Sequence, residues 1–267
     1  MKYAIIGMGF IYSRHIKAIQ DTGGEVVLTC DIDPTKNPDF TDWVEMYHSP
    51  RFKDVDCVVI CTPNYLHGVM AREAVKLNKE VICEKPMYLE YFDTDDKSLE
   101  EITPILQLRY NPALIGLNAR DVYVEAKMFR DDKYWNSWKG NDVKSGGILF
   151  NLGVHYIDIL RVLLGEWLEV ENALVTKTQA TGKIRFENGF GEFHIEIVDD
   201  KSKQGRKVVV DGKEINLSNQ ENLSYEDLHK NVYQDFVMER GYKGENTFAS
   251  LNLIHEIIKC SERVVNV

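Results

Sequence analysis

The chain has 267 residues, of which 44% are hydrophobic and 28% are charged, and its formal net charge is −10. At roughly 100–200 residues per domain this length predicts two domains, and the composition argues against extensive disorder. The acidic balance disfavours nucleic acid and anionic membranes as partners. The longest apolar runs, such as residues 157–164, fall short of the roughly 20 residues that a membrane-spanning helix needs. We therefore expect no membrane partner.

Five cysteines and the N-terminal segment bear on the cellular compartment. The cysteines form no CxxC pair, and four of them lie in or beside apolar, strand-like runs. This pattern is typical of buried thiols in a reducing compartment, so no metal site is expected. The first residues read as a strand followed by a glycine turn, without the apolar core and cleavage site of a signal peptide. A cytoplasmic protein is the expectation.

Short apolar runs alternate with amphipathic segments through the first part of the chain. The pattern predicts strands at residues 2–6, 25–31, 56–61, 80–84 and 103–108, and helices at residues 10–20 and 65–77. Nearly continuous apolar strands separated by helices are typical of a parallel sheet that is covered on both faces. Residues 1–111 are therefore predicted to form an α/β Rossmann domain.

The pattern changes near Asn111 and Pro112. Beyond them it predicts strands at residues 122–129, 167–176, 179–187 and 190–198, a small hairpin at 206–217, and helices at 148–164, 224–240 and 247–264. Asn188-Gly189, between two of these strands, is a hairpin signal. Residues 112–267 are therefore predicted to form an α+β domain with a mainly antiparallel sheet.

A glycine turn follows the first predicted strand. Gly7 and Gly9 open a helix, where backbone N–H groups and the helix dipole can approach a pyrophosphate. Asp31 ends the second strand, about 20 residues on, where a carboxylate binds the ribose hydroxyls of NAD and repels the 2′-phosphate of NADP. The alternative for Asp31 is a solvated acid. Tyr12 occupies the third glycine position of the fingerprint, so helix and strand are expected to pack less closely there.

Two further motifs lie at the ends of the third and fourth strands. Thr62-Pro63-Asn64 and Glu84-Lys85-Pro86 fall at the sheet edge where ligands bind in open α/β folds. The alternative for Lys85 is an ordinary surface lysine. The predicted cofactor is NAD, and its predicted contacts are Gly7, Gly9, Phe10, Ile11, Asp31, Thr62, Pro63, Asn64, His67, Glu84 and Lys85.

The helix predicted at residues 148–164 carries an unusual polar stripe. Asn151, His155 and Asp158 are spaced i, i+4 and i+7, so they share one face of the helix, and the opposite stripe is apolar. The preceding Gly146-Gly147 permits close approach of a ligand or of the other domain. A lone histidine on such a helix is more often structural, but three polar groups after a glycine pair favour a site.

Taken in order, these motifs resemble those of the Gfo/Idh/MocA oxidoreductases. The resemblance rests on Glu84-Lys85-Pro86, on the segment from Thr62 to His67, and on the segment from Gly146 to Asp158. It implies a Rossmann domain followed by an α+β domain with an open sheet that makes homo-oligomer contacts, as a dimer or tetramer. Two departures stand out: many members have Asp at the position of Asn151, and residues 87–102 are too short for the long helix usual there.

Three shorter segments resemble the branch of this family that oxidises UDP-N-acetylglucosaminuronic acid at C3. They are residues 107–112, 138–140 and 151–155. The resemblance implies a UDP-linked N-acetylated hexuronate as substrate. Residues 127–147 carry five basic and three acidic side chains, a local balance of +2 that suits an anionic ligand; a solvated loop is the alternative.

The expected chemistry removes a proton from the substrate hydroxyl while a hydride passes to NAD. His155 is the expected general base, because the ordinary pKa of histidine, about 6.5, lies near working pH. Lys85 is expected to orient the hydroxyl or to act as the base itself, and Asn151 to hold the sugar or the imidazole. The predicted substrate contacts are Lys85, Arg109, Trp138, Lys139, Asn151 and His155.

Two other functions stay open from the sequence. One is another sugar or inositol dehydrogenase of the same family. The other is a non-catalytic regulator that senses NAD or a sugar on the same fold, since a fold does not determine a function. Such regulators can lose the lysine or the histidine, and both Lys85 and His155 are present here.

Overall fold

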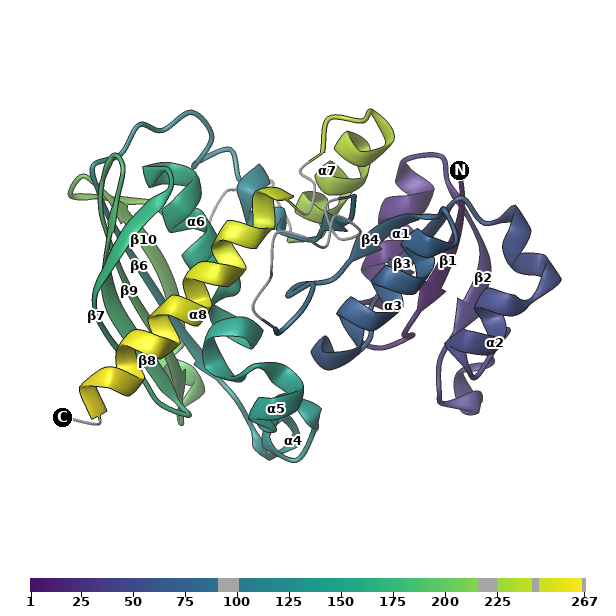
Figure 1. Cartoon of the computed structure of the whole chain (residues 1–267), viewed down its shortest axis with the longest axis horizontal. Coiled ribbons are helices and arrows are strands. Elements are labelled where there is room, and N and C mark those ends of the chain that lie inside the picture. Colours follow the sequence, from purple (N-terminus) through teal and green to yellow (C-terminus); the bar gives the residue numbers. More distant parts are fainter. Residues whose placement is uncertain (91–100, 216–224, 242–244, 266–267) are drawn as a thin grey trace. The chain divides into compact units, whose positions relative to one another are not determined.

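The computed structural model describes residues 1–90, 101–215, 225–241 and 245–265 (Figure 1). The chain folds as two compact units. Unit 1 comprises Met1–Tyr88, Asp93–Gln107 and Leu223–Asn246, and unit 2 comprises Leu89–Phe92, Leu108–Asn222 and Thr247–Val267. A segment near the C-terminus thus belongs to unit 1. The predicted domain boundary between residues 111 and 112 stays a prediction.

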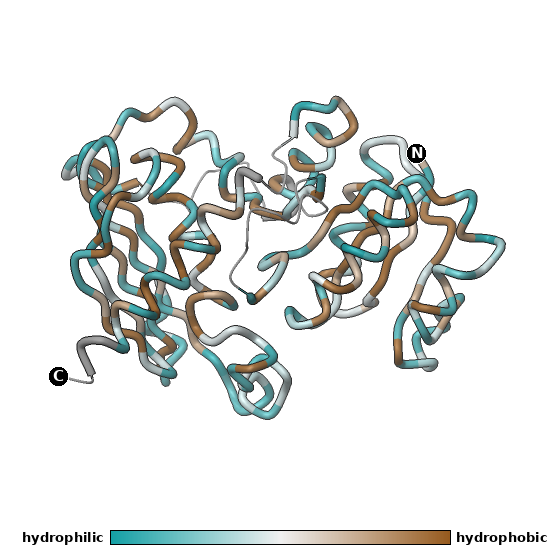
Figure 2. Tube along the Cα trace, in the orientation of Figure 1, coloured by the Kyte–Doolittle hydropathy of each residue, from teal (hydrophilic) through white to brown (hydrophobic). Residues whose placement is uncertain are grey.

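Unit 1 is built on a five-stranded parallel sheet. Its strands are β1 (Lys2–Ile6), β2 (Glu25–Cys30), β3 (Cys57–Ile60), β4 (Glu80–Cys83) and β5 (Thr103–Pro104), in the order β2-β1-β3-β4-β5. All four residues of β3 are buried, as expected of a strand covered on both faces. Figure 2 shows the hydrophobic colouring along these strands. The predicted parallel Rossmann sheet is confirmed.

The fifth strand is shorter than the predicted residues 103–108. Ile105 N–H still reaches the Cys83 carbonyl, but Leu106 N–H turns back to the Pro104 carbonyl at 3.0 Å, two residues earlier. An i to i+2 bond of this kind is a γ-turn, which ends an extended run. A 3₁₀ turn, η4 (Gln107–Tyr110), follows and carries Arg109.

The α-helices in the described part of unit 1 are α1 (Tyr12–Asp21), α2 (Trp43–His48), α3 (Asn64–Lys76) and α7 (Tyr225–Val237). α1 and α3 lie within two residues of the helices predicted from the apolar stripes. The short α2 was not predicted; the Asp42 carboxylate caps its first turn by accepting from Val44 N–H at 2.7 Å. α7 packs against α1, so a segment more than 200 residues later in the chain completes the Rossmann unit.

Unit 2 contains a six-stranded mixed sheet. Its strands are β6 (Asp121–Phe129), β7 (Trp167–Val175), β8 (Gln179–Phe186), β9 (Gly189–Val198), β10 (Gly205–Val210) and β11 (Lys213–Ile215), in the order β11-β10-β6-β9-β8-β7. Only β6 and β9 pair in parallel within this sheet. The predicted mainly antiparallel sheet and both hairpins are confirmed. Residues 216 and 217 of the second hairpin lie outside the described residues.

Helices cover one face of this sheet. They are α6 (Val154–Leu164) and α8 (Glu245–Val265), and shorter turns α4 (Asp132–Trp135), η5 (Trp138–Gly140) and α5 (Asp142–Ser145) precede them. Buried and half-buried residues alternate along β6, and α6 packs on β6 and β9. Figure 1 shows α6 and α8 on the same side of the sheet.

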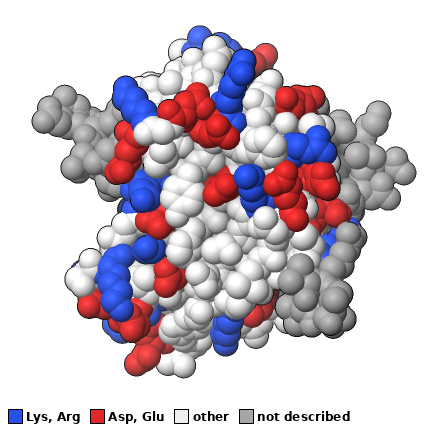
Figure 3. Space-filling view, turned by 90° about the vertical axis from the view of Figure 1, so that its left-hand side faces the viewer, with Lys and Arg blue, Asp and Glu red and all other residues white. Residues whose placement is uncertain are grey.

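The opposite face of the sheet is charged. Glu125 pairs with Lys127 at 3.3 Å, and Lys183 pairs with Glu192 at 3.4 Å. Figure 3, from the side where Figure 1 draws this sheet, shows acidic and basic side chains interleaved with uncharged surface. The alternation of charge along half-buried strands is typical of a sheet with one face on a core.

One helical stretch, Asp142–Leu164, is long and apolar enough by composition to cross a membrane. An 18-residue window in it has a mean hydropathy of 1.5, and 78% of that window is buried inside the protein. The stretch is broken by Gly146 and Gly147, both at positive φ. It is therefore the core helix of unit 2. The predicted shortness of residues 87–102 concerns a segment whose residues 91–100 lie outside the described part of the chain.

Candidate functional site

The glycine turn after β1 is built for close approach. Gly7 has φ +96°, and a Cβ there would lie 2.6 Å from the Cys61 carbonyl oxygen, so only glycine fits. A Cβ on Gly9 would meet no protein atom within 4 Å. The protein's own packing thus does not demand glycine at this second position, whereas a bound pyrophosphate would. Gly7 also lies beside Thr62 N, which brings two of the predicted motifs together.

Asp31 follows β2 directly and lies against this turn. Its carboxylate accepts hydrogen bonds from Met8 N–H at 2.6 Å, from Asp33 N–H at 2.9 Å and from the Lys36 ammonium at 2.9 Å. Burial acts to raise the pKa of Asp31, but these three donors outweigh it and hold the pKa below its ordinary value. Asp31 is therefore an ionised group at the cofactor turn, as its predicted role requires.

His67, on α3, joins the ends of β3 and β4. Its Nδ1 lies 2.7 Å from the Pro86 carbonyl and its Nε2 2.7 Å from the Thr62 carbonyl, and the ring is 1% exposed. Burial lowers the pKa of His67, although both carbonyls act in the opposite direction. The predicted cofactor residue thus ties together two of the backbone segments at the ligand edge of the sheet.

Glu84 and Lys85 come directly after β4. Glu84 Oε2 accepts from Lys85 N–H at 3.2 Å, and its Oε1 lies 3.1 Å from Nε2 of His15, on α1. Glu84 N–H continues the sheet by donating to the Ile60 carbonyl. The Glu84 carboxylate therefore points into the interior of unit 1, toward His15. Lys85 is half-buried at the end of the strand.

In unit 2 the predicted polar stripe divides between two environments. Residues Leu149–Gly153 form a single π-helical turn before α6, and Asn151 lies in it. The Asn151 amide donates to the Tyr134 hydroxyl at 2.8 Å. His155 follows on α6 and is 6% exposed. Single π turns of this type are frequent at functional sites.

Asp158, the third member of the stripe, is used for structure. It forms a bidentate ion pair with Arg109: Nε donates to Oδ2 at 2.7 Å and Nη2 to Oδ1 at 2.6 Å, with both side chains 2% exposed. The Ser250 hydroxyl also donates to Oδ1 at 2.7 Å. The fork of Arg109, predicted to grip the substrate, thus holds η4 to α6.

The predicted basic segment contains a local concentration of positive charge. The Arg130 guanidinium lies 5.3 Å from the centre of the Tyr134 ring, and Lys139 lies 5.7 Å from that of Trp138. Burial first, and then the charge of Arg130, lower the pKa of Lys139. Burial and the nearby Arg206 lower the pKa of Arg130. Cations that lie near one another in this way are suited to an anionic ligand.

Sequence reasoning missed several residues at these positions. Arg206 comes from β10, far along the chain, and only the pairing of β10 with β6 brings it near Arg130. Ile32, also missed, is 90% exposed directly after Asp31, and Phe10, a predicted cofactor contact, is 83% exposed in the glycine turn. These apolar side chains could contact the adenine of a bound NAD. An isoleucine directly after the strand-end Asp31 is the sequence signal that would have identified Ile32.

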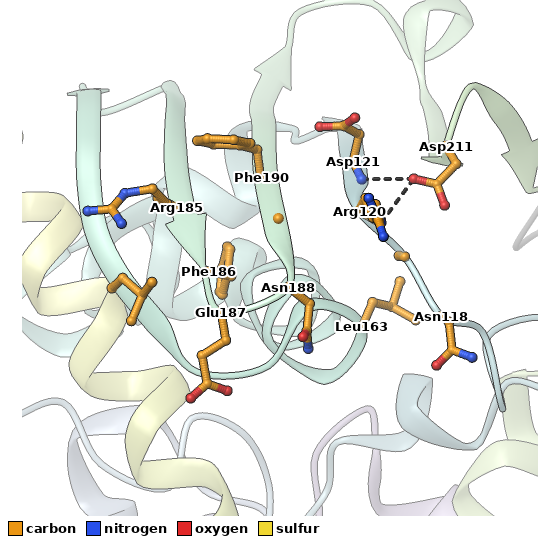
Figure 4. Close-up of a pocket in the computed structure, with 13 residues that line it drawn as sticks. Asn118, Arg120, Asp121, Leu163, Arg185, Phe186, Glu187, Asn188, Phe190 and Asp211 are labelled. Carbon is orange, nitrogen blue, oxygen red and sulfur yellow. Dashed lines mark hydrogen bonds between the residues drawn. The ribbon is translucent and has the colours of Figure 1, made fainter.

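A separate pocket of about 960 Å³ lies at one end of the sheet in unit 2 (Figure 4). Phe186, Glu187 and Asn188 of the β8–β9 turn contribute to its wall. On another side, Asp211 accepts from the backbone N–H groups of Arg120 and Asp121 at 3.0 and 2.9 Å. None of the predicted site residues lines this pocket.

Fold and site together define the class of protein: an oxidoreductase with an NAD-binding Rossmann domain. The family model described as "Oxidoreductase family, NAD-binding Rossmann fold" matches residues 1–102. The model for the C-terminal alpha/beta domain of the same family matches residues 116–247. The chain belongs to the Gfo/Idh/MocA oxidoreductase family.

Curated relatives resemble part of the chain. The 2,7-anhydro-N-acetylneuraminate hydratase of Escherichia coli is 27% identical over 188 residues, 62% of this chain and 50% of its own length. The inositol 2-dehydrogenase of Salmonella typhimurium is 26% identical, over 62% of this chain and 55% of its own length. The chain spans about half the length of the curated relatives it matches.

Solved structures resemble nearly all of the chain. The WlbA (WbpB) dehydrogenase of Thermus thermophilus, in complex with NAD and UDP-GlcNAcA, is 26% identical with a TM-score of 0.81. The match covers 94% of this chain and 92% of that one. The WlbA dehydrogenase of Bordetella pertussis shares the fold at 19% identity, with a TM-score of 0.79 over 98% of this chain and 96% of that one.

Proposed function

We propose that the protein oxidises the C3 hydroxyl of UDP-N-acetylglucosaminuronic acid to a ketone with NAD, in nucleotide-sugar biosynthesis. One observation carries the proposal: a structure solved with both NAD and this sugar matches 94% of the chain at 26% identity. The motifs at residues 107–112, 138–140 and 151–155 support the same substrate.

The proposed chemistry rests on Lys85 of unit 1 and on Asn151 and His155 of unit 2. NAD, when bound, would supply the hydride acceptor for C3, and the hydroxyl proton would go to a protein base as the C=O bond forms. We assign His155 as that base, with Lys85 orienting the hydroxyl. Asn151, held through its amide by Tyr134, is positioned to accept a hydrogen bond from the sugar.

The anionic groups of the substrate need cationic partners, but Arg109 is already paired with Asp158. We therefore assign the diphosphate or the uronate to Arg130, Lys139 and Arg206. Lys139 and Arg206 each lie close enough to Arg130 to lower a neighbour's pKa, so an anion would relieve their mutual repulsion, and charge-assisted hydrogen bonds are the strong ones. Trp138, beside Lys139, is suited to stack on the sugar or the uracil.

The deciding assay compares UDP-N-acetylglucosaminuronic acid with UDP-N-acetylglucosamine, UDP-glucuronic acid and myo-inositol. Each reaction contains 2-oxoglutarate as a possible hydride acceptor, since tightly held NADH would hide turnover. We expect the N-acetylated uronate to be oxidised fastest. Faster oxidation of myo-inositol or of a free sugar would overturn the substrate assignment and favour the inositol 2-dehydrogenases among the relatives.

A non-catalytic sensor is the competing proposal from another class. The presence of both Lys85 and His155 favours an enzyme. A single-turnover measurement of absorbance at 340 nm, with enzyme in stoichiometric amount, distinguishes a catalytic enzyme from a sensor. A sensor would bind NAD and sugar without any change at that wavelength.

We further propose a homo-oligomer in the cytoplasm, with the charged face of the six-stranded sheet as its contact. That face carries both acidic and basic side chains, which suits pairing with a second copy of itself, because a two-fold interface must be self-complementary.

A further inference from the structure

A cluster of polar side chains lies buried in unit 1, behind the strand end that carries Lys85. It comprises His15 of α1, Glu84 at the end of β4, and His229 and Tyr233 of α7. The two histidines and the tyrosine are at most 1% exposed, and the Glu84 side chain is 14% exposed. Buried polar groups of this kind cost stability unless they are paired, so their arrangement needs a reason.

The contacts converge on one carboxylate. Glu84 Oε1 lies 3.1 Å from His15 Nε2 and 3.6 Å from His229 Nε2, while Oε2 accepts from Lys85 N–H at 3.2 Å. His15 Nδ1 lies 2.7 Å from the Tyr233 hydroxyl. The His15 and His229 rings meet edge to face, 5.6 Å between centres. A chain of contacts therefore runs from α7 through His15 and Glu84 to the backbone of Lys85.

Protonation can be assigned from these contacts. Burial lowers the pKa of His15, which favours the neutral ring. A neutral ring satisfies both contacts when Nε2–H donates to Glu84 and Nδ1 accepts from the Tyr233 O–H. Burial raises the pKa of Glu84, but the two histidines outweigh it and hold the pKa well below its ordinary value. The cluster thus holds an ionised carboxylate next to Lys85.

We propose that His15, His229 and Tyr233 are positioning residues that hold Glu84 ionised and in place, and through it set the orientation and charge environment of Lys85. The expected effect of these residues on catalysis rests on the proposed function. The proposal gives α7 a reason to belong to the Rossmann unit: this helix supplies two of the three positioning residues, His229 and Tyr233.

A divalent cation is the other use of such a cluster. One donor atom from each of His15, Glu84 and His229 lies within 4.8 Å of the other two, and histidine with carboxylate suits zinc. The network is favoured because a protonated Nε2 of His15 has no lone pair for a metal. The 2.7 Å contact to Tyr233 completes the hydrogen bonding of this ring without one.

The test uses Tyr233→Phe and Glu84→Gln in the full-length protein, with Tyr47→Phe as the matched control. Tyr47 is also a buried tyrosine of unit 1, and its hydroxyl donates to the Met70 carbonyl rather than to the cluster. All three variants are checked by circular dichroism. We expect kcat to fall about 10-fold or more in the two cluster variants, with NAD affinity retained, and to stay unchanged in Tyr47→Phe.

A second readout needs no substrate. Lysines are reductively methylated with ¹³C, and the Lys85 signal is the one that Lys85→Arg removes. We expect its titration midpoint to move to lower pH in Glu84→Gln and Tyr233→Phe, because the neighbouring negative charge is lost or weakened, and to be unchanged in Tyr47→Phe. If no sugar is oxidised, the proposed function fails. The Lys85 titration still tests whether the cluster positions Glu84 beside Lys85.

Three results would overturn the proposal. An unchanged Lys85 titration in both folded cluster variants would make the cluster merely structural. Loss of NAD affinity in Glu84→Gln with kcat retained would make Glu84 a cofactor ligand. Stoichiometric binding of Zn²⁺ by calorimetry to the wild type, abolished in His15→Gln, would make the cluster a metal site.

Discussion

Asp31 lies among three hydrogen-bond donors, and one of them is a cation. The Lys36 ammonium, 2.9 Å from the carboxylate, partly neutralises the charge that would repel a 2′-phosphate. Lys36 is itself 36% exposed, so it can also face a ligand. We therefore expect a pair of residues to set cofactor preference, with Asp31 favouring NAD and Lys36 opposing it.

Substitutions at this pair should move cofactor preference in opposite directions. We expect the wild type to bind NAD more tightly than NADP, Asp31→Ala to narrow the difference, and Lys36→Ala to widen it. Fluorescence titration of each variant with both cofactors measures the ratio. Tighter binding of NADP by the wild type would refute the ribose assignment.

Asp31 should also contribute to stability in a pH-dependent way. Its pKa is lower in the folded protein than the ordinary 3.9 or so of an unfolded chain. A lowered pKa stabilises the fold fully above the unfolded value, and the contribution is lost as pH falls through the folded value. We expect Asp31→Asn to lower the free energy of unfolding at pH 7 and to differ less from wild type near pH 3. Urea unfolding without cofactor at both pH values measures this, and a constant difference would contradict it.

Lys85 and His155 carry the proposed chemistry. Loss of a general acid or base typically costs about 10²–10⁴-fold in rate. We expect Lys85→Met and His155→Ala each to fall in that range while NAD binding persists. Lys53→Met and His48→Ala, exposed residues of unit 1, are the controls in steady-state assays. Near-wild-type turnover in either site variant would place the chemistry elsewhere.

Among the elements, the helical stretch at residues 148–164 differs most from its prediction. An ideal α-helix would align Asn151, His155 and Asp158, but the π turn over Leu149–Gly153 changes the geometry around Asn151. Asn151 then meets Tyr134 of α4, and Asp158 meets Arg109 of η4. Spacing alone thus identified the polar residues of the helix, whereas their partners came from other elements.

The Arg109–Asp158 pair should be a large stabilising contact only while both partners are present. Removing one partner of a buried ion pair typically costs about 3–5 kcal/mol, because a buried charge is left alone. We expect Asp158→Leu to lower the free energy of unfolding by that amount, and Asp158→Leu with Arg109→Met to lower it less. Urea denaturation measures both. A double variant less stable than Asp158→Leu would show that Arg109 has other stabilising partners.

At the scale of the whole molecule, the outer face of the six-stranded sheet is the candidate contact between copies. Tyr123 lies on it and donates to Glu125 at 3.2 Å. We expect the wild type to be a dimer or tetramer by light scattering, and Tyr123→Asp, which adds a like charge beside Glu125, to shift it toward monomer. Val143→Asp, at an 87% exposed position of α5, is the control. A monomeric wild type would refute the contact.

The sequence by itself determined the parallel Rossmann sheet, the mainly antiparallel second sheet with its hairpins, and the family. These follow from local signals: apolar strands, glycine turns and motif spacing act within a few residues. The glycine turn at Gly7 and the acid at Asp31 could be predicted because the whole motif lies within 25 residues.

Only the tertiary structure decided which side chains meet. The contact between His15 and Tyr233 depends on α7 returning to unit 1, the Arg109–Asp158 pair joins residues 49 apart, and Arg206 approaches Arg130 through strand pairing. Such partners are chosen by burial, since a charge taken out of water must find a counter-charge or donors wherever the fold supplies them. Local sequence does not show which partner a buried charge will meet, because the candidate partners lie at every distance along the chain.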